Sequence, residues 1–371
     1  MEDYSKLSVE DLLVLKKKLE YDVSKYDNAQ AVRKTQLNSA YGVTGTQYFR
    51  FYNTQMAEAI TLSGQMTIQW IAKQLNEYLN KVADTKNVDY IIASDTDSMY
   101  INVDNIVKKY CKETDKRKIA NFVNDMSKNA IEPFIDSNLK KLATQLNVNE
   151  NRILMAREVI ADRGIWTAKK RYALNVWDSK GIRYDKAKQK IVGMETNRSS
   201  TPEIVRTELK KCLNIILTGT ESELKREIKE FKQYFMTAEL EKIAFPRSAN
   251  NMEKYADSRT IYIKKTPIAT KAALLYNHYI KEFNIDHKYM RIQEGEKIKF
   301  LLLKEENPFS GFEKNDSVMG FIRTVPKEFD IEKYVDRKMQ FEKAFIDPIN
   351  TIMQKVGWKF EETNTIEDLF S

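Results

Sequence analysis

The chain has 371 residues, more than one hydrophobic core usually spans, so two or three domains are expected. Apolar residues make up 42% and charged residues 31%, as in a soluble globular protein, and no apolar run reaches the length of a membrane span. Two cysteines and two histidines argue against a disulfide framework, a thiolate zinc site and a histidine-based catalytic triad, whereas the net charge of +8 favours a polyanionic partner if the excess is gathered locally.

Two helices are predicted at the start of the chain. Ser8 is a typical N-cap residue, and the residues behind it place an apolar stripe at helical spacing: Leu12, Leu15 and Leu19. A second helix is expected from Asp27 to about Tyr41, with Gly42 ending it.

Three residues share one face of that second helix. Lys34, Asn38 and Tyr41 lie at positions i, i+4 and i+7. A lysine, an amide and an aromatic ring so arranged suit a phosphate, a sugar or base edge, and a base. Taken alone, the same residues also fit a solvated lysine, a locally bonded amide and a core tyrosine.

A long helix is predicted next, from Thr54 to Lys81, with an apolar stripe that includes Ile60 and Ile71. We interpret it as a core helix without chemistry of its own. It leads to two β-prone runs, 91–92 and 100–103, which flank Asp95-Thr96-Asp97. This pattern predicts a hairpin with the acids at its tip.

The carboxylates of Asp95 and Asp97 are candidate metal ligands. Side chains two positions apart on an extended segment point to the same side, so four oxygens would converge. Carboxylates that close repel each other unless a cation compensates. An oxygen-only ligand set suits Mg²⁺, which takes its remaining ligands from water and phosphates. An isolated Asp-x-Asp is more often ordinary turn chemistry.

A basic stretch opens a later strand. Lys169, Lys170, Arg171 and Tyr172 stand at the start of a strand predicted from Tyr172 to Trp177. Three cations and a tyrosine at this place suit a phosphate backbone or a minor groove. The alternative is a solvated basic strand end.

The periodicity becomes helical near residue 200. Thr201 is expected to cap a helix that begins with Pro202 and ends at Gly219, and Thr220-Glu221-Ser222-Glu223 is a capping box for the next helix. A further helix is expected from Tyr334 to Ile346. The chain closes on a short acidic and aromatic tail: Ile366, Glu367, Asp368, Leu369, Phe370 and Ser371.

Two motifs resemble the DNA polymerases of family B. The stretch 34–42 (KTQLNSAYG) fits the Lys-x-x-x-Asn-Ser-x-Tyr-Gly helix of that family, and Asp95-Thr96-Asp97-Ser98 fits its catalytic hairpin. The sequence between these motifs also looks like the T-even-phage branch. The likeness continues through 168–176, 193–196, 199–202 and 307–309, and so covers nearly the whole chain.

The resemblance implies an α+β fold. It would consist of an incomplete palm with an antiparallel sheet and helices, half of a helical fingers domain, and a mainly helical thumb. The fingers part, with the nucleotide-binding helix, would cover 1–45, the palm with the catalytic hairpin 46–193, and the thumb 194–371.

The resemblance also implies roles for single residues. Lys34 would contact the incoming deoxynucleoside triphosphate, and Asn38 and Tyr41 would line the nascent base pair. The metal ligands would be Asp97, Asp95 and Glu158, around two Mg²⁺ ions. The contacts to primer-template DNA would come from Lys169, Lys170, Arg171 and Tyr172, and the tail 366–371 would dock on a sliding clamp. Two positions depart from the family pattern: Ala156 replaces an aspartate, and Ser94 a glycine.

Several parts of the family fold have no counterpart in this sequence. They include a palm strand with a further aspartate, the first fingers helix and the proofreading exonuclease. We therefore expect a naturally split polymerase, inactive as an isolated chain. A separate N-terminal chain would carry the exonuclease and the other palm aspartate, and would share the two Mg²⁺ ions. Phage DNA replication in the bacterial cytoplasm would be its setting. The alternative is a non-catalytic, DNA-binding and clamp-tethering subunit, which Ala156 favours and the intact hairpin acids do not.

Overall fold

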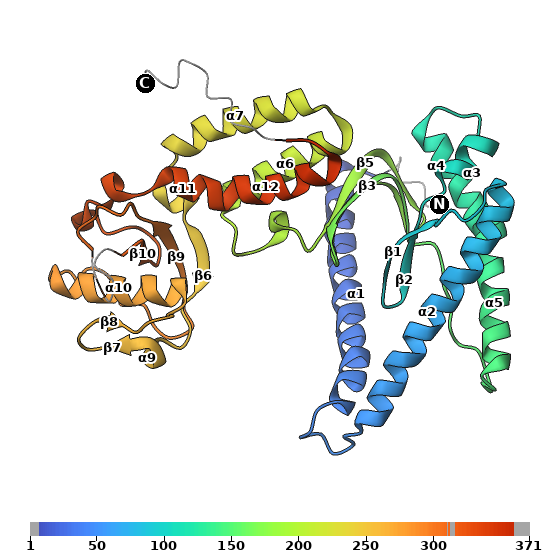
Figure 1. Cartoon of the computed structure of the whole chain (residues 1–371), viewed down its shortest axis with the longest axis horizontal. Helices are drawn as coiled ribbons and strands as arrows, with labels where there is room; N and C mark the ends of the chain where they lie inside the picture. Colours follow the sequence, from blue (N-terminus) through green and yellow to red (C-terminus); the bar gives the residue numbers. More distant parts are fainter. Residues whose placement is uncertain (1–6, 310, 312–315, 360–371) are drawn as a thin grey trace. The chain divides into compact units, whose positions relative to one another are not determined.

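A computed structural model describes residues 7–309, 311 and 316–359 (Figure 1). The contacts divide the chain into two units, 1–112 with 125–156, and 113–124 with 157–371, and each is described by itself. This division crosses the range expected for the palm, so the assignment of fingers, palm and thumb stays a prediction. Among the described residues, no helix combines the length and apolar character that a membrane crossing needs.

The first unit begins with one long helix, α1 (Val9–Thr44). Ser8 caps it as predicted, because its Oγ accepts from the amide of Asp11 at 3.2 Å. The prediction of two helices is wrong, since residues 20–27 contain no glycine or proline to interrupt one helix. Gly42 lies inside the helix, which is capped at Gly45 instead. No residue of α1 is buried.

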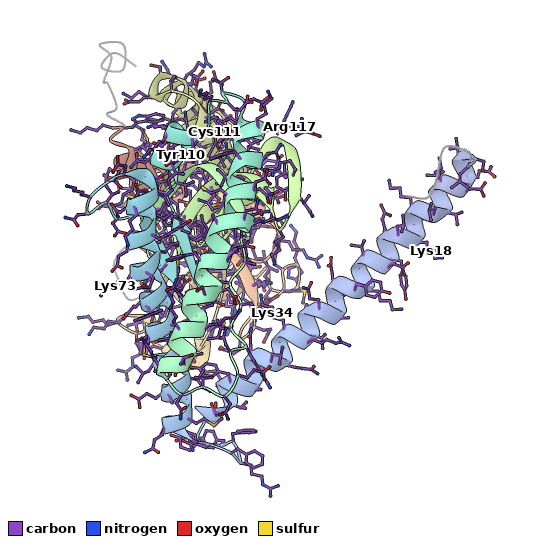
Figure 2. All side chains as sticks on the ribbon, turned by 90° about the vertical axis from the view of Figure 1, so that its right-hand side faces the viewer. Lys18, Lys34, Lys73, Tyr110, Cys111 and Arg117 are labelled. Carbon is purple, nitrogen blue, oxygen red and sulfur yellow. The ribbon has the colours of Figure 1, made fainter. Side chains whose placement is uncertain are left out.

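The second helix, α2 (Thr54–Ala83), starts at Asn53, whose side chain accepts from the amide of Met56 at 2.9 Å. From the loop that joins them, α1 and α2 diverge in both views (Figures 1 and 2). Ile71 is buried, but Ile60 is 47% exposed. The prediction of a core helix therefore holds only for the C-terminal half of α2.

A hairpin and further helices complete this unit. The strands β1 (Ile91–Asp95) and β2 (Ser98–Ile101) pair antiparallel. The helical elements are α3 (Asp104–Tyr110), the π-helical turn η2 (Ser127–Ile131) and α5 (Glu132–Gln145). Their shared core contains Ile71, Leu75, Leu79, Tyr90, Ile106, Ile131, Ile135 and Leu139. The hairpin is thus anchored on the buried half of α2.

The second unit is built on a three-stranded antiparallel sheet. Its strands are β3 (Val159–Ala168), β4 (Arg171–Ser179) and β5 (Ile182–Val192), with β4 in the centre. The predicted strand from Tyr172 to Trp177 is confirmed as part of β4. Helix α4 (Lys116–Met126) runs from this unit into the first one.

Helices and short strands follow the sheet. The helix α6 (Glu203–Thr218) ends at Gly219 as predicted, but Pro202 occupies its cap position and Thr201 makes no capping bond. The capping box of α7 (Glu221–Thr237) is confirmed by reciprocal bonds between Thr220 and Glu223. The helix expected from Tyr334 begins later, at Arg337, because Asp336 caps it. It continues as α11 (Arg337–Phe341), η6 (Glu342–Ile346) and α12 (Asp347–Met353).

The remaining elements of this unit are η3 (Glu195–Asn197), α8 (Leu240–Ile243), β6 (Phe245–Ser248), α9 (Met252–Tyr255), β7 (Ala256–Asp257), β8 (Ile261–Tyr262), α10 (Ile268–Glu282), β9 (Lys297–Leu302), β10 (Val318–Phe321), η4 (Lys327–Phe329), η5 (Ile331–Tyr334) and η7 (Gln354–Val356). One core joins α6, α7 and α10 to the sheet β10-β9-β6 and to α12. The mixture of helices with small antiparallel sheets agrees with the expected α+β class. The predicted clamp-binding tail, 366–371, lies outside the described residues.

Candidate active site and DNA-binding surface

The two acids lie at the tip of the β1–β2 hairpin, as predicted. Asp95 ends β1 opposite Ser98, and Thr96 and Asp97 form the connection. The amide of Asp97 donates to the carbonyl of Asp95 at 2.6 Å, which closes a three-residue turn around Thr96. The backbone is not extended at Thr96, so the alternation of side chains along a strand, on which the prediction relied, does not apply here. The two carboxylates instead stand on either side of the turn residue Thr96.

This turn is conformationally demanding. Thr96 has φ 53°, a left-handed value that a β-branched residue rarely adopts. Its hydroxyl donates to Oδ1 of Asp95 at 3.1 Å, and the hydroxyl of Ser98 donates to the carbonyl of Asp95 at 3.2 Å. Side-chain bonds therefore stabilise an unusual backbone, a feature often associated with functional turns.

Two asparagines of α2 hold the segment that enters the hairpin. Asn76 accepts from the amide of Tyr90 at 2.8 Å, and Asn80 bonds both the amide and the carbonyl of Val88, at 3.0 and 2.8 Å. Tyr90 is buried, and its hydroxyl meets that of Thr85 at 2.8 Å. This support is not among the features predicted from the sequence. The available signal was a pair of asparagines four residues apart on the half of α2 that carries the buried leucines.

The donor set at the hairpin fits Mg²⁺ in part. Asp95 is half-buried and Asp97 is exposed, so both offer hard oxygen ligands to a cation that keeps water and phosphate ligands. Within the described ranges, no three His, Cys, Asp or Glu side chains are grouped so that they hold a metal ion. The hairpin alone therefore supplies two carboxylates and not a complete ligand cage.

The third predicted ligand, Glu158, belongs to the second unit, directly before β3. Its carboxylate pairs with the ammonium of Lys180 at 3.5 Å, and its side chain is 61% exposed. Its carbonyl accepts from the amide of Lys180 at 2.6 Å. Glu158 thus takes part in closing the β4–β5 turn, and its role as a metal ligand stays a prediction.

The predicted nucleotide-binding residues lie on one continuous helix. Lys34, Asn38 and Tyr41 are all exposed on α1 (Figure 2 labels Lys34). The hydroxyl of Tyr41 meets that of Thr61 on α2 at 2.9 Å, close to the loop between the two helices. Tyr41 is therefore not a core tyrosine, as the alternative interpretation of these residues would require. Lys34 and Asn38 remain accessible to a ligand.

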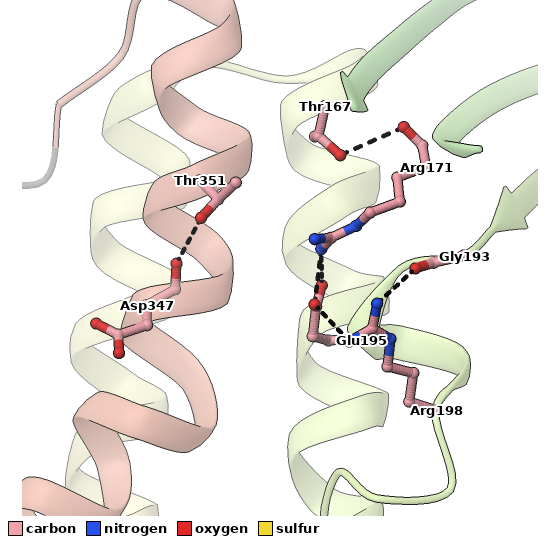
Figure 3. A network of polar contacts seen from close by, with 7 residues as sticks. All are labelled: Thr167, Arg171, Gly193, Glu195, Arg198, Asp347 and Thr351. Carbon is pink, nitrogen blue, oxygen red and sulfur yellow. Dashed lines mark hydrogen bonds and ion pairs between the residues drawn. The ribbon is translucent and has the colours of Figure 1, made fainter. Parts of the chain in front are cut away.

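The predicted DNA-binding residues lie at the β3–β4 turn. Lys169 and Lys170 form the turn, and Lys170 has φ 61°. The ring of Tyr172 stacks on Trp166 with centroids 6.0 Å apart. Arg171 differs from the others, because its guanidinium is bound to the carboxylate of Glu195, with Nη2 to Oε1 at 2.6 Å (Figure 3). Its charge is already compensated inside the protein.

Comparison with known proteins identifies the class. The sequence model of DNA polymerase family B matches residues 13–355, and the chain belongs to this family.

Two curated relatives agree with this assignment, and both carry the name DNA-directed DNA polymerase. The polymerase of Enterobacteria phage T4 is 34% identical over 355 residues, and that of Escherichia phage RB69 is 35% identical over 360 residues. In each case the match covers 92% of this chain but only 38% of the relative.

Proposed function

We propose that this chain is the C-terminal catalytic portion of a template-directed DNA polymerase. The observation that carries the proposal is the Asp95-Thr96-Asp97 turn at the tip of an anchored hairpin, in a chain of this family. Helix α1 of the same unit carries the lysine, amide and tyrosine expected to receive the nucleotide. The setting proposed is phage DNA replication in the cytoplasm of a bacterial host.

Each part of the site has a chemical task. Asp97 and Asp95 would hold divalent Mg²⁺, which when bound lowers the pKa of the primer hydroxyl and stabilises charge on the triphosphate. Lys34 would neutralise phosphate charge as a compact cation. Asn38 and Tyr41 would restrict the space beside the new base pair. The β3–β4 turn would hold the primer strand through Lys169 and Lys170, and Glu158 would lie near the metals.

We further propose that a separate chain completes the site. Two carboxylates do not make a ligand set for two metal ions, so a further aspartate is needed. Helix α1 supports this idea, because it has no buried residue although Leu12, Leu15, Leu19 and Val23 line one apolar groove along it. An amphipathic helix of a companion chain, which also carries the exonuclease, would cover this stripe. Residues 366–371 would bind a sliding clamp.

A non-catalytic subunit that binds DNA and tethers a clamp is the second candidate. Ala156 favours it, since this position lacks a carboxylate, and so does the pairing of Glu158 with Lys180. The two candidates share DNA binding and differ in chemistry.

Primer extension separates them. The purified chain would be mixed with a labelled primer-template, deoxynucleotides and Mg²⁺, with and without the companion chain. We expect extension only when both chains and the metal are present. Extension by this chain alone would disprove the need for a companion. No extension with both chains, although duplex DNA is bound, would favour the non-catalytic subunit.

A further inference from the structure

The DNA-binding turn is tied to a segment more than twenty residues away. Beside the Arg171–Glu195 pair, Arg198 also contacts Glu195, with Nη1 to Oε1 at 3.4 Å, and donates to the carbonyl of Gly193 at 3.3 Å. Figure 3 shows the two guanidinium groups converging on one carboxylate. The segment 193–198 thus faces the end of the β3–β4 hairpin.

Backbone packing reinforces this link. Gly193 has φ 67°, and a Cβ atom at this position would lie 2.2 Å from the carbonyl oxygen of Lys170. Only glycine permits the two backbones to approach so closely. On the other side, the hydroxyl of Thr167 donates to the carbonyl of Arg171 at 3.3 Å. The lysine turn is therefore held from both sides.

Glu195 is the charged centre of this network. The side chains of Arg171 and Glu195 are only 28% and 19% exposed, so water screens their pairing less than at an open surface. Nη2 of Arg171 lies within hydrogen-bond distance of both carboxylate oxygens of Glu195, and charge-assisted bonds of this kind are stronger than neutral ones.

We infer that Glu195 is a positioning residue for the DNA-binding turn. By holding Arg171, it fixes the backbone from which Lys169 and Lys170 reach the phosphates of the primer strand. This inference rests on the proposed function, because it presumes that the turn binds DNA. It assigns Arg171 an internal role in place of a direct DNA contact.

The inference is tested by the direction in which one substitution changes the affinity for DNA. Glu195→Gln removes a negative charge, so electrostatics alone predicts tighter DNA binding. Positioning predicts the opposite: affinity of the full chain for a fluorescent primer-template, measured by anisotropy, should fall about threefold to tenfold. Glu203→Gln is the matched control, since it removes the same charge from an exposed residue at the start of α6. Its binding should stay equal or become slightly tighter.

A double-mutant cycle excludes a merely structural effect. Lys170→Ala should weaken binding clearly in the wild type and in Glu203→Gln, but by less than about twofold in Glu195→Gln, where the turn is no longer positioned. Thermal unfolding would show that each variant is folded at the temperature used. If Glu195→Gln does not fold, Arg171→Lys serves in the same cycle, because it keeps the charge but replaces the planar guanidinium by a more flexible ammonium group.

The outcomes are distinct. Equal or tighter binding by Glu195→Gln, or an unchanged effect of Lys170→Ala in its presence, would overturn the positioning role. Absence of salt-dependent duplex binding by the wild-type chain would instead overturn the proposed function.

Discussion

At the scale of single residues, the hairpin acids carry the chemistry that is proposed. Asp97→Asn keeps the size of the side chain and removes its charge. We expect nucleotide incorporation by the assembled enzyme to fall at least about a hundredfold, because charge stabilisation at the reacting centre is lost. Binding of duplex DNA should change less than about twofold. Quantitative primer extension and anisotropy would measure the two effects.

Asp104→Asn is the control for this prediction. It makes the same change on an exposed residue of the same unit, at the start of α3, where the carboxylate pairs with Lys108. Incorporation should stay near the wild-type rate. Wild-type incorporation by Asp97→Asn would remove the metal-binding role from the hairpin.

Gly193 allows a prediction about stability. Gly193→Ala combines a positive φ with a clash against the backbone of Lys170, whereas Gly181→Ala combines φ 87° with open space around the new Cβ. The second variant should lose about 1 kcal/mol from the unfavourable φ alone. The first should lose at least about 2 kcal/mol, because backbone must also move. Urea unfolding would compare them, and equal losses would show that the contact with Lys170 is unimportant.

At the scale of elements, Glu208 on α6 and Glu227 on α7 form a pair of carboxyl groups whose pKa values are shifted in opposite directions. Burial, followed by a hydrogen bond to Glu227, raises the pKa of Glu208 to about 7. For Glu227, burial would raise the pKa, but hydrogen bonds from Lys211 and Glu208 lower it overall. The folded chain therefore keeps a proton on Glu208 that the unfolded chain releases near pH 4.5. Stability from this site falls as the pH rises from about 4.5 to 7.

Glu208→Gln should remove this dependence. Since Glu208 is partly exposed, we expect an effect of only about 1 kcal/mol, or ~2–4 °C in the melting temperature. Between pH 5.5 and pH 8, the melting temperature of the wild type should fall by more than that of Glu208→Gln. Glu230→Gln, at an exposed pair with Arg226 on α7, should behave like the wild type. Identical pH profiles of wild type and Glu208→Gln would contradict the prediction.

At the scale of the whole molecule, α1 decides whether a companion chain binds. Leu19→Asp places a charge in the apolar stripe and should weaken the complex with the companion chain at least about tenfold. Leu13 is also exposed but lies about 100° around the helix from Leu12, so Leu13→Asp is a matched control. Sedimentation of the mixed chains would measure both. Equal weakening by the two variants would show that the stripe is not the interface.

The hairpin, the capping box of α7 and the end of α6 at Gly219 could be predicted from the sequence. Their signals are local: a β-prone run beside an Asp-x-Asp turn, a Thr and a Glu three positions apart, and a glycine after the helix. The single helix α1 differs from the two helices predicted, because Asp27 is a plausible helix start but no glycine or proline interrupts residues 20–27. The helix also continues past Gly42, because one glycine by itself does not end a helix.

The sequence by itself thus determined the family, the hairpin and several helix boundaries, and the residues that are proposed to react. Only the tertiary structure decided which half of α2 is buried, that Glu195 holds Arg171, and that Gly193 packs against Lys170. The physical reason is separation along the chain. Local propensity and periodicity act over a few residues, whereas these contacts join segments that only the folded sheet and core bring together.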